Sequence, residues 1–304
     1  MNLSSVSNSG IVASGGTISV GGNVSAEQHL HHGTAPGSTG SADSVRRRAD
    51  VAVLTVLREE MAAVAEVLSR APDHWVDRAY GGAAVHRATV STPEGPLRVV
   101  ATQALEPGTH SALIAFRDLC QRFAPQLVLL VGIAGAVRAD VEIGDVVLAD
   151  EVIWYDSRRE TEDGPKRRGR IQATAPVLRR RVNDFLVRHG TLFQLEPGRS
   201  HRIHRGPVGS GNAVVTDAGS DIRGWLVEVH EKVLAVETEA GGLAQGFYEA
   251  VDGARPLRGW MTIRGISDHA DRQKGHRDHE LASRHAAAVL ERLLPFLRLA
   301  PEES

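Results

Sequence analysis

The chain has 304 residues, of which 42% are hydrophobic and 24% are charged, as in ordinary globular proteins. Its 35 Lys and Arg residues nearly balance its 37 Asp and Glu residues, and a formal net charge of −2 excludes a strongly basic nucleic-acid coat or an acidic solvating tail as the main role of the chain. The single cysteine, Cys120, cannot form an internal disulfide or a cysteine cluster, which favours a reducing, cytoplasmic location.

The first fifty residues differ in composition from the rest of the chain. Residues 1–50 are rich in Ser, Gly and Asn and hold few large apolar side chains, so we expect a flexible tail, which would be free to contact a protein partner. Two short β-like pieces lie within residues 10–25, but disorder is the simpler interpretation. The cluster of His29, His31 and His32 has no further ligand group nearby, which favours polar linker over a metal site.

From residue 51 onward, short apolar runs alternate with amphipathic segments. Strands are expected at residues 51–57, 97–105, 125–135 and 258–268, an extended hairpin at 143–156, and a strand passing into a helix at 232–250. Helices are expected at residues 58–71, 110–123 and 280–299. Continuous apolar strands separated by helices indicate an α/β fold, with a mixed or parallel β-sheet covered by helices on both faces. We therefore expect one folded domain over residues 51–304. No apolar run reaches the roughly 18 to 20 residues that span a bilayer, and no secretory signal begins the chain, so no membrane partner is expected.

Three carboxylates stand where predicted strands end: Glu60, Glu239 and Asp268. Because open α/β sheets bind ligands at the carboxyl ends of their strands, these side chains are candidates for one shared site. The structural alternative for Glu60 and Glu239 is a first-turn carboxylate favoured by the helix dipole, and for Asp268 a loop-initiating residue. The glycine turn at 131–136 also follows a buried strand, but it has neither dinucleotide-binding nor Walker spacing.

Five segments, taken in chain order, resemble the successive motifs of the nucleoside phosphorylase and nucleosidase superfamily. They are VAVLTVLREEM, LVLLVGIAGAVRADVEIGDVVLADEVIWYDS, VGSGNAVV, VLAVETEAGGLAQ and IRGISDHAD. The resemblance spans residues 51–299 and is strongest to the methylthioadenosine/S-adenosylhomocysteine nucleosidase branch and to related domains of bacterial defence and signalling proteins. It implies a nucleoside phosphorylase-like fold and hydrolysis of the N-glycosidic bond of a purine nucleoside or nucleotide, without a metal or organic cofactor.

The resemblance assigns a role to each matching residue. Glu60 matches the Glu that activates the attacking water, and Asp268 matches the Asp that delivers a proton to N7 of the leaving purine. Glu239 matches the ribose-binding Glu, whose carboxylate accepts hydrogen bonds from both ring hydroxyls. The other matching residues are Glu237 and Thr238 beside the ribose, Ile133, Ala134 and Gly135 at the turn near the sugar and the nucleophile, and Val214 and Val215 beside the base.

Three departures from the family pattern change the expected site. Val214 stands where the family commonly has an aromatic residue, so stacking on the base should be weaker and purine specificity lower. Thr238 replaces the usual Met and gives the ribose a smaller, more polar wall. Arg58 replaces one of the acids that often precede the water-activating Glu, and it is a candidate contact for an anion.

A basic cluster follows the predicted hairpin, at Arg158, Arg159, Lys166, Arg167, Arg168 and Arg170. In a flexible loop near the site, Arg158 and Arg159 would join Arg58 in holding nucleotide phosphates, because guanidinium groups bind phosphate bidentately. The alternative is a solvated loop whose cations face neighbouring acids. A nucleic-acid partner is disfavoured, because no aromatic residues are interleaved with the basic ones. A similar polar loop is expected to hold His276, Asp278 and His279 in solvent rather than on a metal.

Water is the expected nucleophile, because a carboxylate at Glu60 would repel phosphate. Two alternatives stay open. One is a phosphate-dependent purine nucleoside phosphorylase, and the other is a catalytically silent nucleotide-sensing module that the tail attaches to a larger assembly. Since the family usually forms dimers or larger symmetric oligomers, the resemblance also implies a homodimer in which a neighbour helps to complete the pocket.

Overall fold

The computed structural model describes residues 11–14, 17–20, 48–78, 82–196, 198–250, 257–271 and 276–300. The chain divides into two compact units, Met1–Ala42 and Asp43–Ser304. In the first unit, β1 (Ile11–Ser14) and β2 (Thr17–Val20) pair with each other in antiparallel fashion. Most of the predicted tail, including the histidine cluster at 29–32, lies outside the described residues, so its flexibility stays a prediction.

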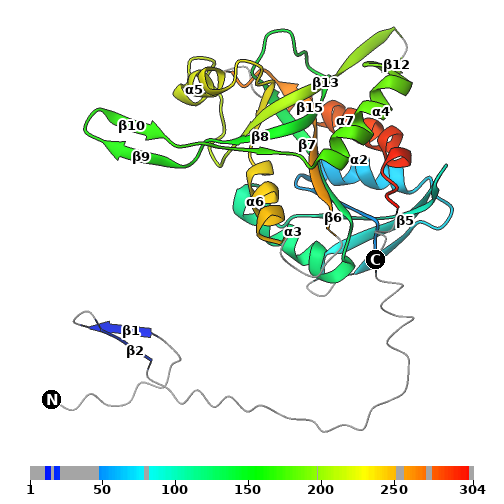
Figure 1. Cartoon of the computed structure of the whole chain (residues 1–304), viewed down its shortest axis with the longest axis horizontal. Coiled ribbons are helices and arrows are strands. Elements are labelled where there is room, and N and C mark those ends of the chain that lie inside the picture. Colours follow the sequence, from blue (N-terminus) through cyan, green and yellow to red (C-terminus); the bar gives the residue numbers. More distant parts are fainter. Residues whose placement is uncertain are drawn as a thin grey trace. The chain divides into compact units, whose positions relative to one another are not determined.

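The second unit is built on a mixed β-sheet (Figure 1). Its strands are β3 (Val51–Thr55), β4 (Trp75–Arg78), β5 (Ala84–Thr92), β6 (Gly95–Gln103), β7 (Leu127–Ala136), β8 (Val146–Trp154), β11 (Arg170–Ala173), β12 (Leu192–Glu196), β13 (Arg199–Ser210), β14 (Ala235–Glu237) and β15 (Gly259–Asp268). Their order is β11-β8-β13-β14-β7-β3-β6-β5-β4, with β12 on β13 and β15 on both β7 and β8. The predicted mixed sheet is therefore confirmed.

Strand β15 closes part of this sheet into a ring. It runs parallel to β7 and antiparallel to β8, while β13 and β14 connect β8 to β7. The short strand β14 pairs with the last residues of β7, where Val236 faces Gly135. Since β3 and β15 both run parallel to β7, the carboxyl ends of these three strands meet at one end of the sheet, next to β14.

Helices cover both faces of the sheet, as the alternation of strands and helices predicts. Successive residues of β3 point to opposite faces, so that Val51 and Val53 join one core and Ala52 and Leu54 join the other. The first core is covered by α2 (Arg58–Leu68), α4 (Pro176–His189) and α7 (His279–Leu293). The second is covered by α3 (Thr109–Phe123) and α6 (Ala240–Ala250), and α5 (Asp221–Val229) packs on a smaller third core. No helix of the described residues is long and apolar enough to cross a membrane.

Three segments differ from the sequence-based expectation. Residues 143–156, expected as a hairpin, contain the single strand β8, because its partners β11, β13 and β15 come from later in the chain. The hairpin lies in the arginine-rich segment instead, where β9 (Arg158–Thr161) and β10 (Gly164–Arg167) form a two-stranded arm that extends away from the helices in Figure 1. The last helix ends at Leu293 and continues as a 3₁₀ turn through Phe296, because Pro295 has no backbone N–H to continue an α-helix.

Candidate active site

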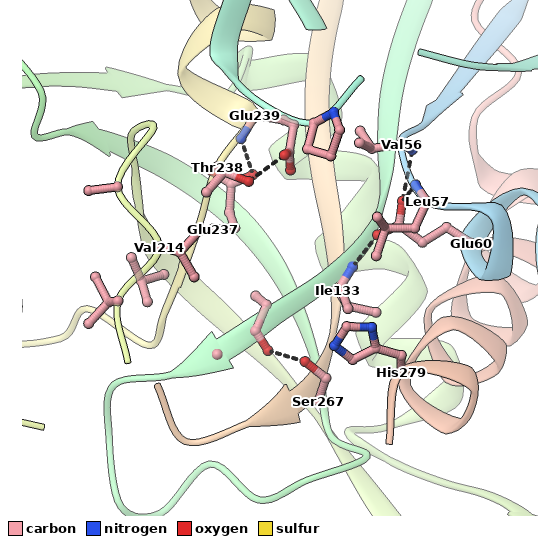
Figure 2. A pocket seen from close by; sticks show the side chains of 16 residues that line it. Val56, Leu57, Glu60, Ile133, Val214, Glu237, Thr238, Glu239, Ser267 and His279 are labelled. Carbon is pink, nitrogen blue, oxygen red and sulfur yellow. Dashed lines mark hydrogen bonds between the residues drawn. The ribbon is translucent and has the colours of Figure 1, made fainter. Parts of the chain in front are cut away.

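A pocket opens where β3, β7, β14 and β15 come together (Figure 2). The cavity has a volume of about 150 Å³ and is partly open to solvent. Figure 2 shows Val214 on the opposite side of the pocket from Glu60 and His279. The sequence-predicted residues that line it are Glu60, Ile133, Ala134, Gly135, Val214, Val215, Glu237, Thr238 and Glu239.

Glu60 is held in place by three backbone N–H groups. Its Oε2 accepts hydrogen bonds from the nitrogens of Val56 and Leu57, both at 2.8 Å, and its Oε1 accepts one from Ile133 at 2.9 Å. The first two bonds cap the N-terminus of α2, and the third ties that turn to β7. Glu60 is therefore a first-turn helix carboxylate, as the structural alternative describes, and the same carboxylate also lines the pocket.

A buried arginine connects the carboxylates of the pocket. Arg264 on β15 has no exposed surface, and its Nη2 donates to Oε2 of Glu239 at 3.0 Å and to Oε2 of Glu237. Its Nη1 lies 4.0 Å from Oε1 of Glu60. Gly132 makes this arrangement possible, because a Cβ there would lie 2.3 Å from Nη1 of Arg264 and 2.4 Å from Oε1 of Glu60. The sequence analysis missed Arg264, although a charged residue inside the apolar run WMTIRGIS signals a need for buried partners.

The charges around this arginine do not balance, since three carboxylates surround one guanidinium. Burial raises the pKa of Glu60 to about 7, aided by the charge of Glu239 and opposed by Arg264 and the backbone N–H groups. Burial likewise raises the pKa of Glu237. Burial disfavours the charged form of Arg264, but the surrounding carboxylates outweigh it and hold the pKa of Arg264 above its usual value. Glu60 is therefore able to exchange a proton near neutral pH.

Glu237 and Glu239 have different partners although they lie two residues apart. Glu237 accepts hydrogen bonds from the backbone nitrogens of Glu239 at 3.1 Å and Ala240 at 2.9 Å, which ties it to the start of α6. Oε1 of Glu239 accepts a hydrogen bond from the backbone nitrogen of Gly108 at 3.1 Å and one from the hydroxyl of Thr238. Gly108 has a φ of +110°, a backbone conformation that favours glycine. Glu237 thus fixes the backbone at the start of α6, whereas Glu239 connects the segment at Gly108 to the segment at Thr238 in the pocket wall.

Asp268 ends β15 next to the pocket. Its Oδ2 accepts a hydrogen bond from the hydroxyl of Ser267 and its Oδ1 accepts one from the backbone nitrogen of Ala270, both at 2.8 Å. A Cβ at Gly135 would lie 2.7 Å from Oδ1 of Asp268, so the glycine allows the carboxyl group to approach β7. Among the described residues, Ser267 lines the pocket and Asp268 does not, although Asp268 contacts the lining at Gly135 and Ser267.

The cations suggested as phosphate contacts lie outside the described lining of the pocket. Arg58, the first residue of α2, has 89% of its side chain exposed and pairs with Glu59 at 3.6 Å. Arg158 lies on β9 and its Nε donates to Oε1 of Glu160 at 2.6 Å, while Arg159 lies beside it on the same strand. The hairpin places Arg158 and Arg159 on an exposed arm, as the alternative of a solvated loop describes.

His279 is a pocket residue that the sequence analysis placed in a solvated loop. It is the first residue of α7, it lines the pocket, and its Nδ1 lies 3.3 Å from Nδ1 of His276. Within the described ranges, no group of three or more His, Cys, Asp or Glu side chains is arranged to hold a metal ion. Sequence reasoning also left out Ser267, whose hydroxyl donates to Asp268, and five lining residues whose apolar side chains carry no chemical signal: Val56, Leu57, Pro107, Ala213 and Val236.

The sequence of this chain is similar to those of known proteins. A protein-family model described as Phosphorylase superfamily matches residues 50–297. The chain is 24% identical over 269 residues to ATP nucleosidase Cap17 of Escherichia coli, covering 82% of this chain and 52% of that protein. It is 28% identical over 200 residues to a 5'-methylthioadenosine/S-adenosylhomocysteine nucleosidase of Mycobacterium bovis, covering 59% of this chain and 74% of that protein. The chain thus spans about half the length of the first of these relatives.

Solved structures share the fold. A 5'-methylthioadenosine/S-adenosylhomocysteine nucleosidase of Helicobacter pylori superposes with a TM-score of 0.64 at 19% identity, covering 80% of this chain and 96% of that one. A futalosine hydrolase of the same organism has the same TM-score at 18% identity, and the same shares of the two chains are covered. At these identities the likeness supports the fold alone.

Proposed function

Because this chain belongs to the phosphorylase superfamily, we propose that it hydrolyses the N-glycosidic bond of a purine nucleoside or nucleotide and releases the free base. The observation that carries the proposal is the convergence of Glu60 and Glu239 on one pocket around the buried Arg264, with Asp268 beside it. Relatives named as nucleosidases agree with this reaction class.

Glu60 is the proposed general base. In its ionised form it takes a proton from water, whose oxygen attacks the anomeric carbon as the bond from that carbon to the purine nitrogen breaks. Burial favours the protonated carboxyl group that results, because the pKa of Glu60 lies near 7. Three N–H groups fix the orientation of this carboxylate, so it needs little rearrangement during the reaction.

Asp268 is the proposed general acid for the leaving base. The electron pair of the broken bond moves onto the purine, and a proton from Asp268 to N7 neutralises the charge that develops there. Glu239 is the proposed partner of the ribose hydroxyls, and Thr238 lies beside it. Val214, on the far side of the pocket from Glu60, would face the base together with its lining neighbour Val215.

Water is favoured over phosphate as the nucleophile by the charges of the lining. The described residues that line the pocket include three carboxylic acids, Glu60, Glu237 and Glu239, but no Lys or Arg. Arg264 is already engaged by two of these acids. A phosphate dianion beside Glu60 would meet repulsion of about 4 kcal/mol per charge at 4 Å in a partly buried site.

The proposed role of the exposed arginines depends on whether the substrate carries phosphate groups. The name of the Escherichia coli relative favours a nucleotide, whereas the name of the Mycobacterium bovis relative favours a nucleoside thioether. For a nucleotide, Arg58, Arg158 and Arg159 are the proposed phosphate contacts, and a homodimer would allow the hairpin of one copy to approach the pocket of the other. Alanine at both Arg158 and Arg159 should then raise the KM for AMP but not for adenosine.

The test is chromatographic detection of free base from purified protein. Adenosine, methylthioadenosine, S-adenosylhomocysteine, inosine, guanosine, AMP and ATP are each incubated with and without inorganic phosphate. Release without phosphate that disappears in Asp268→Asn supports the hydrolase. Release only with phosphate indicates a phosphorylase, and nucleotide binding without any release indicates the silent sensing module.

A further inference from the structure

Tyr155 follows β8 and contacts the loop that forms the proposed purine side of the pocket. Its side chain is fully buried, and its hydroxyl lies 2.8 Å from the carbonyl oxygen of Ala213 and 3.1 Å from that of Gly211. Its backbone nitrogen donates to the carbonyl oxygen of Ser210 at 3.0 Å. Burial, with nearby carboxylates, raises the pKa of Tyr155, so its hydroxyl keeps its proton and remains a donor.

Asp156 contacts the same loop through a different residue. Its Oδ2 accepts hydrogen bonds from both the backbone nitrogen of Asn212, at 2.8 Å, and the side-chain nitrogen of Asn212, at 2.7 Å. The side-chain oxygen of Asn212 then accepts a hydrogen bond from the backbone nitrogen of Thr109 at 3.1 Å. Thr109 follows Gly108, whose nitrogen donates to Glu239. Asp156 is therefore connected through Asn212 to the proposed ribose-binding carboxylate.

Gly211 shows how closely these two side chains approach the loop. A Cβ at this position would lie 2.4 Å from Cε2 of Tyr155 and 2.5 Å from Oδ1 of Asp156. A real Cβ does not come this close to a non-bonded atom, so both side chains reach the loop only because residue 211 is a glycine. Val215, at the end of the loop, packs with Tyr155 in one apolar cluster.

The loop depends on Tyr155 and Asp156 because it has no regular secondary structure that would order its backbone. Residues 211–215 form no helix or strand, and Val214 in the middle of the loop is 60% exposed. Without an aromatic side chain, the wall cannot gain much affinity from stacking on a base. Affinity then depends on how far the backbone of the loop is ordered before the ligand binds.

We propose that Tyr155 and Asp156 are positioning residues for purine binding. Tyr155 fixes the backbone of residues 211–213 and thereby the wall formed by Ala213, Val214 and Val215. Asp156 fixes Asn212 and, through it, the relation of this wall to Gly108 and Glu239. This inference rests on the proposed function, because it takes the side of the pocket at Val214 as the purine side.

Three variants test the proposal by steady-state kinetics on adenosine and by calorimetric titration with free adenine. Tyr155→Phe keeps the ring and removes the donor. It should raise the KM for adenosine and the Kd for adenine about tenfold each, while kcat changes less than about threefold. Asp156→Ala should have a similar effect, and Asp156→Asn should recover much of it, because an amide oxygen still accepts both bonds from Asn212. The matched control is Tyr248→Phe, whose exposed hydroxyl on α6 lies 3.4 Å from the carbonyl oxygen of Ala173 and outside the pocket lining.

The outcomes separate this inference from the proposed function. Hydrolysis by the wild type, with Tyr155→Phe and Asp156→Ala keeping its KM and adenine Kd, would overturn the inference and leave the proposed function standing. A lower melting temperature with unchanged KM and Kd would show a purely structural role and overturn it too. Should the wild type release no base, the proposed function fails, and adenine titration of the same variants still decides the inference. A wild type that neither releases base from any of the seven compounds nor binds adenine would overturn both.

Discussion

Lowering the pH should switch hydrolysis off through the protonation of Glu60. The pKa of Glu60 lies at about 7 because the carboxyl group is buried, and only its ionised form can take a proton from water. With this pKa, the ionised fraction is about 90% at pH 8, about 9% at pH 6 and about 1% at pH 5. The value of kcat/KM should therefore fall about tenfold from pH 8 to pH 6 and about ninetyfold by pH 5.

The assay is release of adenine from adenosine across this pH range. A substrate without phosphate is needed, because a phosphate group itself titrates near pH 6. Fluorescence at each pH checks that the protein remains folded. The matched variant Glu60→Gln should lose roughly 10²- to 10⁴-fold in rate and should show no dependence on pH over this limb. A wild-type limb centred near pH 4.5, the ordinary value for Glu, or a limb that persists in Glu60→Gln, would refute the reasoning.

Three further predictions concern stability and the acid. The pKa of Glu60 is higher in the folded than in the unfolded chain, so the free energy of unfolding, relative to Glu60→Gln, should fall by about 3 kcal/mol as the pH rises from 4.5 to 8, as measured in urea. Asp268→Asn should lower kcat by about 10²- to 10⁴-fold while nucleoside affinity, measured by calorimetry, persists. Gly132→Ala should destabilise the protein by about 1–3 kcal/mol through contact with Arg264, whereas the control Gly224→Ala, in open space on α5, should stabilise it by about 0.5–1 kcal/mol, both measured by thermal unfolding.

Local hydrophobic patterns were sufficient to predict the strands that are buried on both faces and the helices that pack on them. The apolar run at 51–57 predicts β3, and the helical spacing after it predicts α2, because a strand buried on both sides and a helix buried on one side leave different periods in the sequence. The same reasoning predicts α3, β7 and β15 to within a few residues. The strands β4, β5 and β11 to β13 and the helices α4 and α5 carry weaker patterns and were not predicted.

Chain order placed carboxylates at strand ends, and this was enough to predict that Glu60 and Glu239 come together, as they do in the lining of one pocket. It was not enough to find His279, because a histidine in a polar segment looks the same whether the following helix starts at a pocket or in solvent. Arg264 shows the same limit in another form. A buried arginine requires anionic partners, but its position in β15 does not tell which carboxylates reach it.

By itself, the sequence determined the α/β class, the order of the main elements and the acids at the strand ends, because burial and strand termination are properties of neighbouring residues. Only the tertiary structure decided that β15 pairs with both β7 and β8, that the arginines lie on a projecting hairpin, and that Arg264 joins the acids of the pocket. These features depend on contacts between residues distant in the chain. The shift of the Glu60 pKa follows from them, since burial and charge at Glu60 are properties of the assembled site.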